Sequence, residues 1–405
     1  MGTLDGKKIL LGVTGGIAAY KAAEIVRLLT KAGAEVRVVM TRNAREFIGP
    51  QTLATLSGQP VVTEMFHGGA DPEIEHIRVP ENADLALVAP ATANFIAKIA
   101  VGIADDPLST MLLVARCPIL IAPAMNPNMY AHPTVVENLA TLRKRGAIIV
   151  EPDAGEVACG WTGPGRLATP EHIFEEVVAA MTAKDLEGEK ILVTAGPTRE
   201  AIDPARYVSN RSSGKMGFAL ARAALRRGAE VTLISGPTAL TPPPGAKFIR
   251  VETAEEMLAA AKKEFSPSTI LLMAAAVSDY RPESRAENKI KRTKDSLTVN
   301  MTACPDILKT LSAMRKKNQI LVGFAAETDD ILKNAQKKLA EKKLDLIVAN
   351  QVGAPDSGFD HDTNRIKILD KEGGIQEFPL LTKDEAAEKV LNHVAKLRND
   401  LSPAK

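Results

Sequence analysis

The chain contains two copies of one strand–turn–helix–strand pattern, and this duplication constrains its fold more than any other feature. GKKILLGVTGG begins at Gly6 and GEKILVTAGPT begins at Gly188, and each is a short apolar strand ending in a turn rich in Thr and Gly. Each leads through a helical stretch to a second strand introduced by GAEV, at Gly33 and at Gly228. Strands that are almost continuously apolar are typical of parallel sheets covered by helices on both faces. The sequence therefore predicts two doubly wound α/β domains, each with its ligands at the carboxyl ends of the strands.

The length of the chain also favours two domains, because 405 residues are more than one ordinary core accommodates. The polar segment Met181 to Gly188 separates the two copies, and we place the domains at residues 1–186 and 187–405. The second copy carries an insertion, Thr198 to Asn210, between its strand and its helix. Further strands are predicted at Ala83–Ala89, Pro118–Ala122, Ala147–Val150, Thr269–Ala276, Gln319–Ala325, Leu344–Ala349 and Asp362–Lys371, before a helix at Thr382–Leu397.

Composition excludes several classes of function. The net charge is +2, from 51 basic and 49 acidic residues, so no bulk attraction to nucleic acid or to a membrane is expected. The longest apolar run, Ile270 to Val277, is far shorter than the ~20 residues of a membrane span, and the first residues do not resemble a signal peptide. Three scattered cysteines without a CxxC pattern predict neither a disulfide framework nor a zinc site, and they favour the reducing cytoplasm.

A glycine pair marks the first candidate site. Gly15 and Gly16 follow the first strand and precede a helix, where backbone N–H groups and the helix N-terminus suit a phosphate. The pattern is not GxGxxG, and Thr14 with paired glycines is closer to a flavodoxin-type monophosphate site than to a pyrophosphate loop. Thr41 ends the second strand, at the position where such folds place a further cofactor contact. A tight connection without a ligand is an equally frequent interpretation of such a turn.

Three later segments of the first half carry reactive or polar side chains. His76 lies on a short, alternating apolar stretch, where a hydrogen-bonded structural histidine is the more common interpretation. PATANF and PAMNPNMY end two predicted strands, and the second places the amide of Asn126 at a carboxyl end. Cys159 stands among glycines, which favours a mobile flap that excludes water over a buried, apolar cysteine.

The order of these motifs resembles that of the flavin-dependent cysteine decarboxylases. TGGIAAYK, the His76 segment, PATANFIAKIAVGIADD, PAMNPNMY and ACG-x-x-GPGR occur as they do in phosphopantothenoylcysteine decarboxylases and in peptide-cysteine decarboxylases. The resemblance implies a flavodoxin-like domain in which FMN is the electron sink that a cysteine carboxylate lacks when CO₂ leaves. It implies FMN contacts at Gly15, Gly16, Ile17, Thr41, Thr92 and Asn94.

The same resemblance implies catalytic roles for three residues. His76 is the expected base for the oxidation step, and Asn126 is expected to hold the substrate carboxylate by hydrogen bonds. Cys159 is the expected proton donor in the last step. Two positions depart from the family pattern: Trp161 replaces the usual acidic residue, and Tyr130 stands where a tryptophan is frequent. These departures concern the packing of the flap and leave the matched reactive residues intact.

The second half contains a phosphate-binding candidate and two groups of lysines. Ser212, Ser213, Gly214 and Lys215 precede a helix whose backbone donors could bind phosphates, although the spacing is not that of a Walker A loop. An ordinary capped helix start is the alternative. The basic groups around Lys289 and Lys338 could likewise be solvated faces, or a nonspecific patch for nucleic acid.

The motifs of the second half are similar to those of bacterial phosphopantothenate–cysteine ligases. DPARYVSNRSSGKMG, MAAAVSDYRP, NKIKR, CPDIL, GFAAET and NAQKKLAEKKLD occur in the order of that family. The resemblance implies a Rossmann-like ligase domain in which the carboxylate of 4′-phosphopantothenate attacks the α-phosphate of CTP. Pyrophosphate leaves, and the product is an acyl-cytidylate. The amine of L-cysteine then attacks this acyl-cytidylate and forms the amide, with release of CMP.

The ligase resemblance also implies site residues. Asn210 is expected to bind the acyl-cytidylate or the pantothenate side of the substrate. Lys289 is expected to neutralise the triphosphate or assist the attack of cysteine, and Asp279 to contact Mg²⁺ or the nucleotide. The remaining nucleotide contacts are expected at Met273, Ala274, Ala275, Pro305, Asp306, Ile307, Leu308, Phe324, Lys338 and Lys342. Gly353 to Phe359 is predicted as a loop that could close over the nucleotide.

Together the two resemblances imply consecutive steps of coenzyme A biosynthesis, from 4′-phosphopantothenate to 4′-phosphopantetheine. They also imply a homo-oligomer, with trimeric flavin domains and dimeric ligase domains. Two other classes stay open: a non-catalytic regulatory subunit, which the retained His76, Asn126 and Cys159 disfavour, and an NAD(P)-dependent oxidoreductase. The absence of GxGxxG from both first turns disfavours the oxidoreductase, and a yellow chromophore on the purified protein would distinguish it from a flavoprotein.

Overall fold

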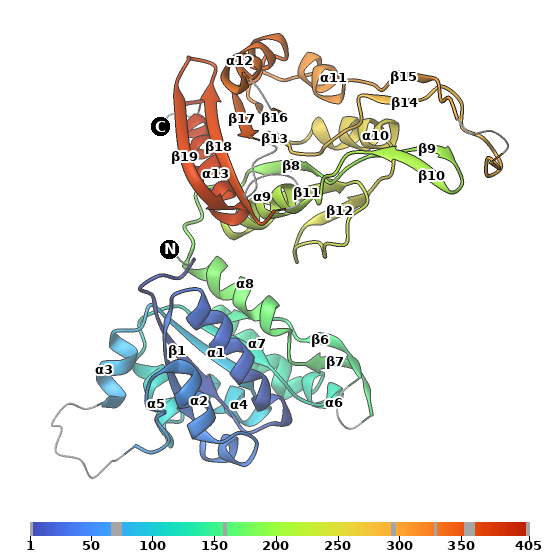
Figure 1. Ribbon diagram of the computed structural model, residues 1–405. Helices are drawn as coiled ribbons and strands as arrows, with labels where there is room; N and C mark the ends of the chain where they lie inside the picture. Colours follow the sequence, from blue (N-terminus) through green and yellow to red (C-terminus); the bar gives the residue numbers. More distant parts are fainter. Residues whose placement is uncertain are drawn as a thin grey trace. The chain divides into compact units, whose positions relative to one another are not determined.

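The chain divides into two compact units, residues 1–182 and 183–405, and each is described by itself (Figure 1). The computed structural model describes residues 3–65, 75–156, 160–292, 297–327, 330–351 and 361–401. Cys159 and the predicted loop Gly353–Phe359 lie outside the described residues, as does the side chain of His76. The division falls within the polar segment Met181–Gly188, four residues before the boundary placed at 186. Across the part of the chain that is described, no helix is both long and apolar enough to cross a bilayer.

Unit 1 is built on a five-stranded sheet with the order β2-β1-β3-β4-β5. All neighbouring pairs are parallel. This is the flavodoxin-like strand order, so the expected fold is confirmed for this half. The strands are β1 (Lys8–Val13), β2 (Glu35–Met40), β3 (Leu85–Ala91), β4 (Ile119–Pro123) and β5 (Ile148–Ile149).

Helices cover both faces of this sheet, because successive side chains of each strand point to opposite sides. Leu11 of β1 belongs to a core with helices α1 and α8, whereas its neighbour Leu10 packs with α4, α5 and α7. The helical elements are η1 (Ile17–Lys21), α1 (Ala22–Lys31), η2 (Arg42–Glu46), α2 (Pro50–Ser57), α3 (Glu75–Glu81), α4 (Ala93–Val101), α5 (Pro107–Val114), α6 (Pro127–Tyr130), α7 (Pro133–Lys144) and α8 (Pro170–Met181). His76 therefore lies in the first turn of helix α3 and not in an extended, alternating stretch.

Unit 2 is built on an eight-stranded sheet with the order β12-β11-β8-β13-β16-β17-β18-β19. The first six strands are parallel. When these six are numbered by their order in the chain, their order across the sheet is 3-2-1-4-5-6, as in Rossmann folds. The strands are β8 (Lys190–Ala195), β11 (Glu230–Ser235), β12 (Lys247–Arg250), β13 (Ile270–Met273), β16 (Ile320–Glu327), β17 (Leu346–Gln351), β18 (Thr363–Asp370) and β19 (Ile375–Thr382). The predicted late strand at Asp362–Lys371 is present as β18, and at this edge β18 and β19 extend the parallel sheet in antiparallel orientation. The short turn that joins them, with Gly373 at φ +93, can only reverse the chain direction.

Five helices cover the sheet of unit 2. Helices α9 and α13 pack on one face, and α10, α11 and α12 pack on the other. Their bounds are α9 (Lys215–Arg226), α10 (Ala254–Phe265), α11 (Ile307–Ala313), α12 (Ile331–Glu341) and α13 (Lys383–Leu401). The burial of both faces explains why the strands at the centre carry so few polar residues.

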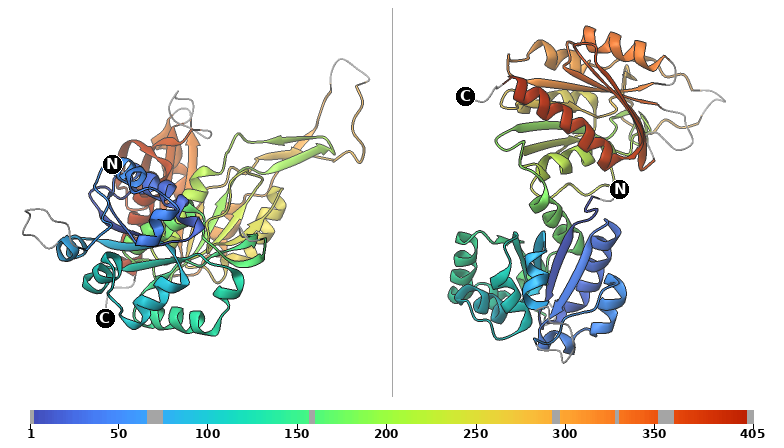
Figure 2. Two further views of the ribbon diagram at one scale, coloured as in Figure 1. Left: turned by 90° about the horizontal axis from the view of Figure 1, so that it is seen from below. Right: turned by 90° about the vertical axis from the view of Figure 1, so that its left-hand side faces the viewer.

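The insertion at Thr198–Asn210 forms a two-stranded antiparallel ribbon, and a second ribbon lies beside it. The first consists of β9 (Arg199–Asp203) and β10 (Arg206–Ser209), and the second of β14 (Tyr280–Pro282) and β15 (Met301–Ala303). Figure 2 shows both ribbons extending away from the main sheet of unit 2.

Candidate functional site

In unit 1 the carboxyl ends of β1 and β3 are joined by the hydroxyl of Thr14. This side chain is buried, donates to the carbonyl oxygen of Pro90 at 2.7 Å, and accepts from the backbone nitrogen of Thr92 at 3.0 Å. The two turns that follow these strands are therefore held at a fixed separation. Because β2, β1 and β3 are neighbours in the sheet, the residues after all three strands meet at one edge.

The glycine pair after β1 places no side chain over the helix start that follows, and Gly16 N donates to Thr14 O at 3.1 Å. A Cβ atom on Gly15 would lie 2.4 Å from Cβ of Asn43, so no side chain fits there. Gly16 is the N-cap of η1 and supplies no side-chain hydrogen bond to the helix start. Ile17, the next residue, is 62% exposed although it is apolar. A helix start with bare backbone and an exposed apolar neighbour suits a phosphate that is attached to an apolar group.

The neighbouring strand ends add three polar side chains to this edge. Thr41 is the N-cap of η2 and makes no side-chain cap bond, and Thr92 is the N-cap of α4 and accepts from Phe95 N at 3.4 Å. Asn94 follows in the first turn of α4 and is exposed. The structure thus brings the residues predicted for the cofactor to the ends of three adjacent strands.

Asn126 follows the next strand, β4, and is the N-cap of the short helix α6. Its Oδ1 accepts from Asn128 N at 2.8 Å. The turn lies against a hairpin of β6 (Asp153–Glu156) and β7 (Thr162–Arg166), because Met125 N donates to Gly165 O at 2.9 Å. Cys159 belongs to the connection between these two strands, which the structure does not describe.

Tyr130 ties helix α6 to the chain segment that enters the hairpin. Its hydroxyl donates to Glu151 Oε2 at 2.8 Å, and Arg143 pairs with the other oxygen of the same carboxylate. Burial, reinforced by the charge and hydrogen bond of Glu151, raises the pKa of Tyr130 to about 12, so the hydroxyl remains a donor at neutral pH. The tyrosine that departs from the family pattern thus has a specific partner at the base of the hairpin.

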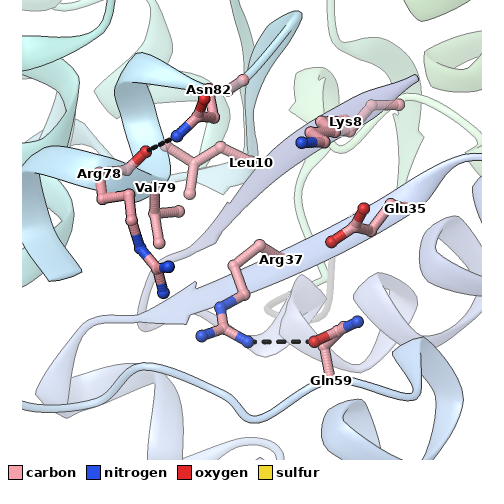
Figure 3. A pocket seen from close by; sticks show the side chains of 10 residues that line it. Lys8, Leu10, Glu35, Arg37, Gln59, Arg78, Val79 and Asn82 are labelled. Atoms are coloured by element: carbon pink, nitrogen blue, oxygen red, sulfur yellow. Dashed lines mark hydrogen bonds between the residues drawn. The ribbon is translucent and has the colours of Figure 1, made fainter. Parts of the chain in front are cut away.

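A cavity of ≈ 320 Å³ also exists in unit 1, but it contains none of the predicted site residues (Figure 3). It lies at the amino ends of β1 and β2, where Lys8 and Glu35 begin these strands. Arg37 Nη1 donates to Gln59 Oε1 across it at 3.2 Å. Ligands of doubly wound sheets bind at the carboxyl ends, so we place the candidate site at the opposite edge.

Unit 2 has two adjoining cavities at the carboxyl ends of its strands, with volumes of ≈ 360 and ≈ 180 Å³. They share five lining residues: Ala275, Val277, Asp279, Phe324 and Lys338. Asn210 and Ala274 line the larger cavity, and the smaller one is lined by Met273, Pro305, Asp306, Ile307, Leu308 and Lys342. All residues predicted for the nucleotide therefore line these cavities except Lys289, which is exposed and does not line either.

Hydrogen bonds hold the end of β13 in place between the two cavities. Asn210 Nδ2 donates to Ala276 O at 3.0 Å and to Val277 O at 3.1 Å. The fully buried Thr194 accepts from Ala275 N at 3.2 Å through Oγ1, which lies 3.3 Å from Met273 Sδ. The backbone that would contact a base is thus fixed by Thr194 of β8 and by Asn210, which follows β10.

The two cavities together are lined by four lysines and two aspartates, so their lining carries an excess of positive charge. Lys338 Nζ lies 3.4 Å from Phe324 O, and Lys342 Nζ pairs with Asp306 at 3.0 Å. Burial opposes the ionisation of Asp306, but the Lys309 N–H and the Lys342 ammonium outweigh it and lower the pKa of that carboxyl. Phosphate groups are the natural counter-ions of such a site. Among the described residues, no three His, Cys, Asp or Glu side chains are grouped to hold a metal ion, although Asp279 lines both cavities.

The structure adds lining residues that the sequence did not indicate. Asn350, near the carboxyl end of β17, donates from Nδ2 to Asn364 Oδ1 on β18 at 3.4 Å, and both line the larger cavity. Lys383, only 7% exposed, joins them from the first residue of α13. They meet because β18 returns antiparallel beside β17, and no local sequence pattern reports this pairing.

Two family models together match nearly the whole chain. Residues 2–182 match the family described as "Flavoprotein", and residues 186–397 match the "DNA/pantothenate metabolism flavoprotein C-terminal domain".

Curated relatives named "Coenzyme A biosynthesis bifunctional protein CoaBC" match over the full length. The Bacillus subtilis (strain 168) protein is 47% identical over 398 residues, which cover 97% of this chain and 98% of the relative. The Vibrio cholerae serotype O1 protein is 46% identical over 394 residues, which cover 97% of this chain and 98% of the relative. The Escherichia coli (strain K12) protein is 44% identical over 396 residues, covering 97% of each.

Solved structures match each half separately. The C-terminal domain of a coenzyme A biosynthesis bifunctional protein CoaBC is 41% identical and covers 54% of this chain and all of its own, with a TM-score of 0.47. The FMN-dependent cysteine decarboxylase SpaF is 34% identical and covers 44% of this chain and 99% of its own, with a TM-score of 0.39.

Proposed function

Because the chain belongs to the CoaBC family of coenzyme A biosynthesis bifunctional proteins, we propose that each unit carries one of two consecutive activities. Unit 2 joins 4′-phosphopantothenate to L-cysteine at the expense of CTP, and unit 1 decarboxylates the product to 4′-phosphopantetheine. The strongest support is that all residues expected for the nucleotide except Lys289, from five separate segments, line two adjoining cavities.

The carboxyl edge of unit 1 fits FMN. Gly15 leaves no room for a side chain, and the starts of η1, η2 and α4 offer backbone donors to a single phosphate. We assign the FMN contacts to Gly15, Gly16, Ile17, Thr41, Thr92 and Asn94. When bound, FMN would supply the electron sink that lets a cysteine carboxylate leave as CO₂.

The residues of unit 1 would bind the substrate and move its protons. Asn126 Oδ1 accepts from Asn128 N, so Nδ2 is the atom with which Asn126 would donate to the substrate carboxylate. We assign the base to His76 and the proton donor of the last step to Cys159, in the connection between β6 and β7. Exclusion of water by that connection would keep the transferred proton on its intended atom.

The residues of unit 2 would activate a carboxylate that is otherwise a poor electrophile. Backbone atoms of Met273, Ala274 and Ala275 would read the cytosine, with Phe324 and the Pro305–Leu308 turn completing the pocket. Lys338 and Lys342 would neutralise the triphosphate, and Asn210 would hold the acyl-cytidylate.

We also propose Mg²⁺ as the cofactor of unit 2, with Asp279 as its protein ligand. Magnesium in nucleotide sites is commonly held by one or two carboxylates together with substrate phosphates, so a single Asp beside the triphosphate suffices. Asp279 lines both cavities and is therefore near either end of a bound nucleotide. We further propose that the protein is cytoplasmic, since its three cysteines are scattered. As the resemblance implies, we also propose a homo-oligomer, whose contacts would cover exposed apolar side chains such as Ile17 and Tyr280.

Mass spectrometry of the products tests the proposal. The purified, FMN-loaded protein is incubated with 4′-phosphopantothenate, L-cysteine, CTP and Mg²⁺, and we expect 4′-phosphopantetheine, CMP and pyrophosphate. Accumulation of 4′-phosphopantothenoylcysteine would support the ligase and reject the decarboxylase. Absence of any CTP-dependent product would instead favour the regulatory-subunit class.

A further inference from the structure

Asp203, at the end of β9, has a fully buried carboxylate that accepts five hydrogen bonds. Oδ1 accepts from Ala205 N at 2.7 Å and from Arg206 N at 2.9 Å. Oδ2 accepts from Arg206 Nε at 3.1 Å and Nη2 at 2.6 Å, and also from Ile290 N at 3.1 Å. The last bond joins residues 87 positions apart in the chain, so the carboxylate connects the turn after β9 to a distant segment.

The segment that carries Lys289 is held to the β9–β10 ribbon from several sides. Arg206 Nη2, already bound to Asp203, donates to Ile290 O at 2.7 Å. Ala286 N donates to Ile202 O at 3.0 Å, four residues before Ile290. Both polar atoms of Ile290 are therefore fixed by the Asp203–Arg206 pair, and Ile290 N belongs to the peptide bond that follows Lys289.

The charge of Asp203 is part of this arrangement. Burial alone would raise the pKa of Asp203, but the N–H groups of Ala205, Ile290 and Arg206 lower it to about 2. The carboxylate is therefore ionised at neutral pH, and hydrogen bonds to an ionised acceptor are about twice as strong as neutral ones. Asparagine at position 203 would replace one carboxylate oxygen by an NH₂ group, which is a donor and cannot accept from these N–H groups.

We propose that Asp203 is a positioning residue of the ligase, which holds Lys289 in register through the backbone of Ile290. The proposal rests on the role proposed above for Lys289. The side chain of Lys289 is exposed, so its reach is set by where its backbone is held. A long, flexible lysine on an unfixed segment would sample many positions, and misplacement by about 1 Å can slow a reaction ~100-fold.

Hydrogen exchange tests the structural half of the proposal in the full-length protein. Asp203→Asn should accelerate exchange of a peptide that spans residues 286–292. Glu200→Gln is the matched control, because Glu200 is also a buried carboxylate of β9, but it accepts from Ala254 N and not from Ile290. Equal exchange in the wild type and Asp203→Asn, or equal acceleration in Glu200→Gln, would overturn the proposal.

A double-mutant cycle tests the functional half. We expect Asp203→Asn to lower the ligase kcat about tenfold or more, with the KM for CTP changed less than about twofold. Glu200→Gln should stay near wild type, and decarboxylation by unit 1 of each variant normalises the ligase rate to the amount of active chain. Asp203→Asn combined with Lys289→Gln should be no slower than Lys289→Gln alone, because one residue acts through the other.

The outcomes separate the two proposals. Suppose that Lys289→Gln lowers the ligase rate. If the double variant is slower still, or if Asp203→Asn alone leaves the ligase rate unchanged, Asp203 does not act through Lys289. If Lys289→Gln ligates at the wild-type rate, the role of Lys289 fails and the positioning role fails with it. If Asp203→Asn melts the ribbon, Arg206→Lys provides the second variant, since it keeps the charge and loses the two-pronged contact with Asp203 and Ile290.

Discussion

Met125 and Gly165 are in direct backbone contact: Met125 N donates to Gly165 O at 2.9 Å, and a Cβ on Gly165 would lie 2.5 Å from Met125 O. Met125 precedes Asn126, and Gly165 lies on the return strand of the hairpin whose connection contains Cys159. Gly165 also has φ +132, a conformation that other residues rarely adopt. The amide proposed to bind the substrate and the proposed proton donor are thus carried by two segments that touch without an intervening side chain.

Gly165→Ala should therefore impair decarboxylation. The added methyl group would push the hairpin away from the Asn126 turn, and the strained φ would destabilise the site by roughly 1–3 kcal/mol. We expect at least a tenfold loss of CO₂ release with ligation unchanged. Gly146→Ala is the matched control, because Gly146 has φ +93 but open space around its Cβ. Equal losses in both variants would mean that backbone strain, and not the contact with Met125, is responsible.

Gly15→Ala should prevent FMN binding. Its Cβ would lie 2.4 Å from Cβ and 2.7 Å from the backbone carbon of Asn43, so the turn must move away from the phosphate position. We expect colourless protein with an unchanged far-ultraviolet spectrum, measured against the flavin absorbance of the wild type. Gly49→Ala, where the Cβ meets nothing within 4 Å, should stay yellow. A yellow Gly15→Ala protein would remove the glycine turn from the cofactor site.

Thr194→Val should weaken the binding of CTP. The change preserves the shape of the buried side chain, but it removes the acceptor of Ala275 N. A buried N–H without a partner costs about 1–3 kcal/mol, and we expect the KM for CTP to rise about tenfold or more. Thr269→Val is the control, since Thr269 exchanges similar bonds with Lys190 at the amino edge of the sheet. Similar KM values in the two variants would contradict a role of the Ala275 backbone in reading the base.

The stabilisation contributed by Asp203 should depend on pH in one direction. Its pKa is lowered in the folded protein, from 3.8 to about 2, so the folded state favours the ionised form. The contribution is full above the unfolded pKa and is lost as the pH falls through about 4 to about 2. Urea midpoints of the wild type and Asp203→Asn should differ at pH 7 and converge toward pH 2. A constant difference across this range would indicate that the charge is irrelevant.

Much of the candidate site was predictable because its signals are local. A glycine pair after an apolar strand indicates a ligand turn, and the parallel sheet then brings Gly15, Thr41 and Thr92 to one edge. Met273 and Phe324 were expected from the family resemblance alone, and both line the smaller cavity from the ends of β13 and β16. The motifs of the family resemblance added Pro305–Leu308 and the lysines of α12, which periodicity alone would have assigned to a solvated helix face.

Other contributors could not be predicted from local pattern. Asn364 and Lys383 reach the larger cavity only because β18 runs antiparallel beside β17, and an alternating strand does not state which neighbour it pairs with. The segment of His76 was interpreted as an alternating stretch, yet Glu75–Glu81 is helical. Short apolar runs of this kind fit both periods, and packing against the rest of the unit decides between them.

The sequence by itself determined the duplicated strand–turn–helix–strand pattern, the doubly wound class of both units and the positions of the turns that we propose bind ligands. These follow from hydrophobic periodicity and from turn residues, which act within a few positions of one another. Only the tertiary structure decided which distant polar groups meet, such as Thr194 with Ala275 and Asp203 with Ile290. The physical reason is that a buried polar group must find a partner, and the partner that folding brings near can be any residue in the chain.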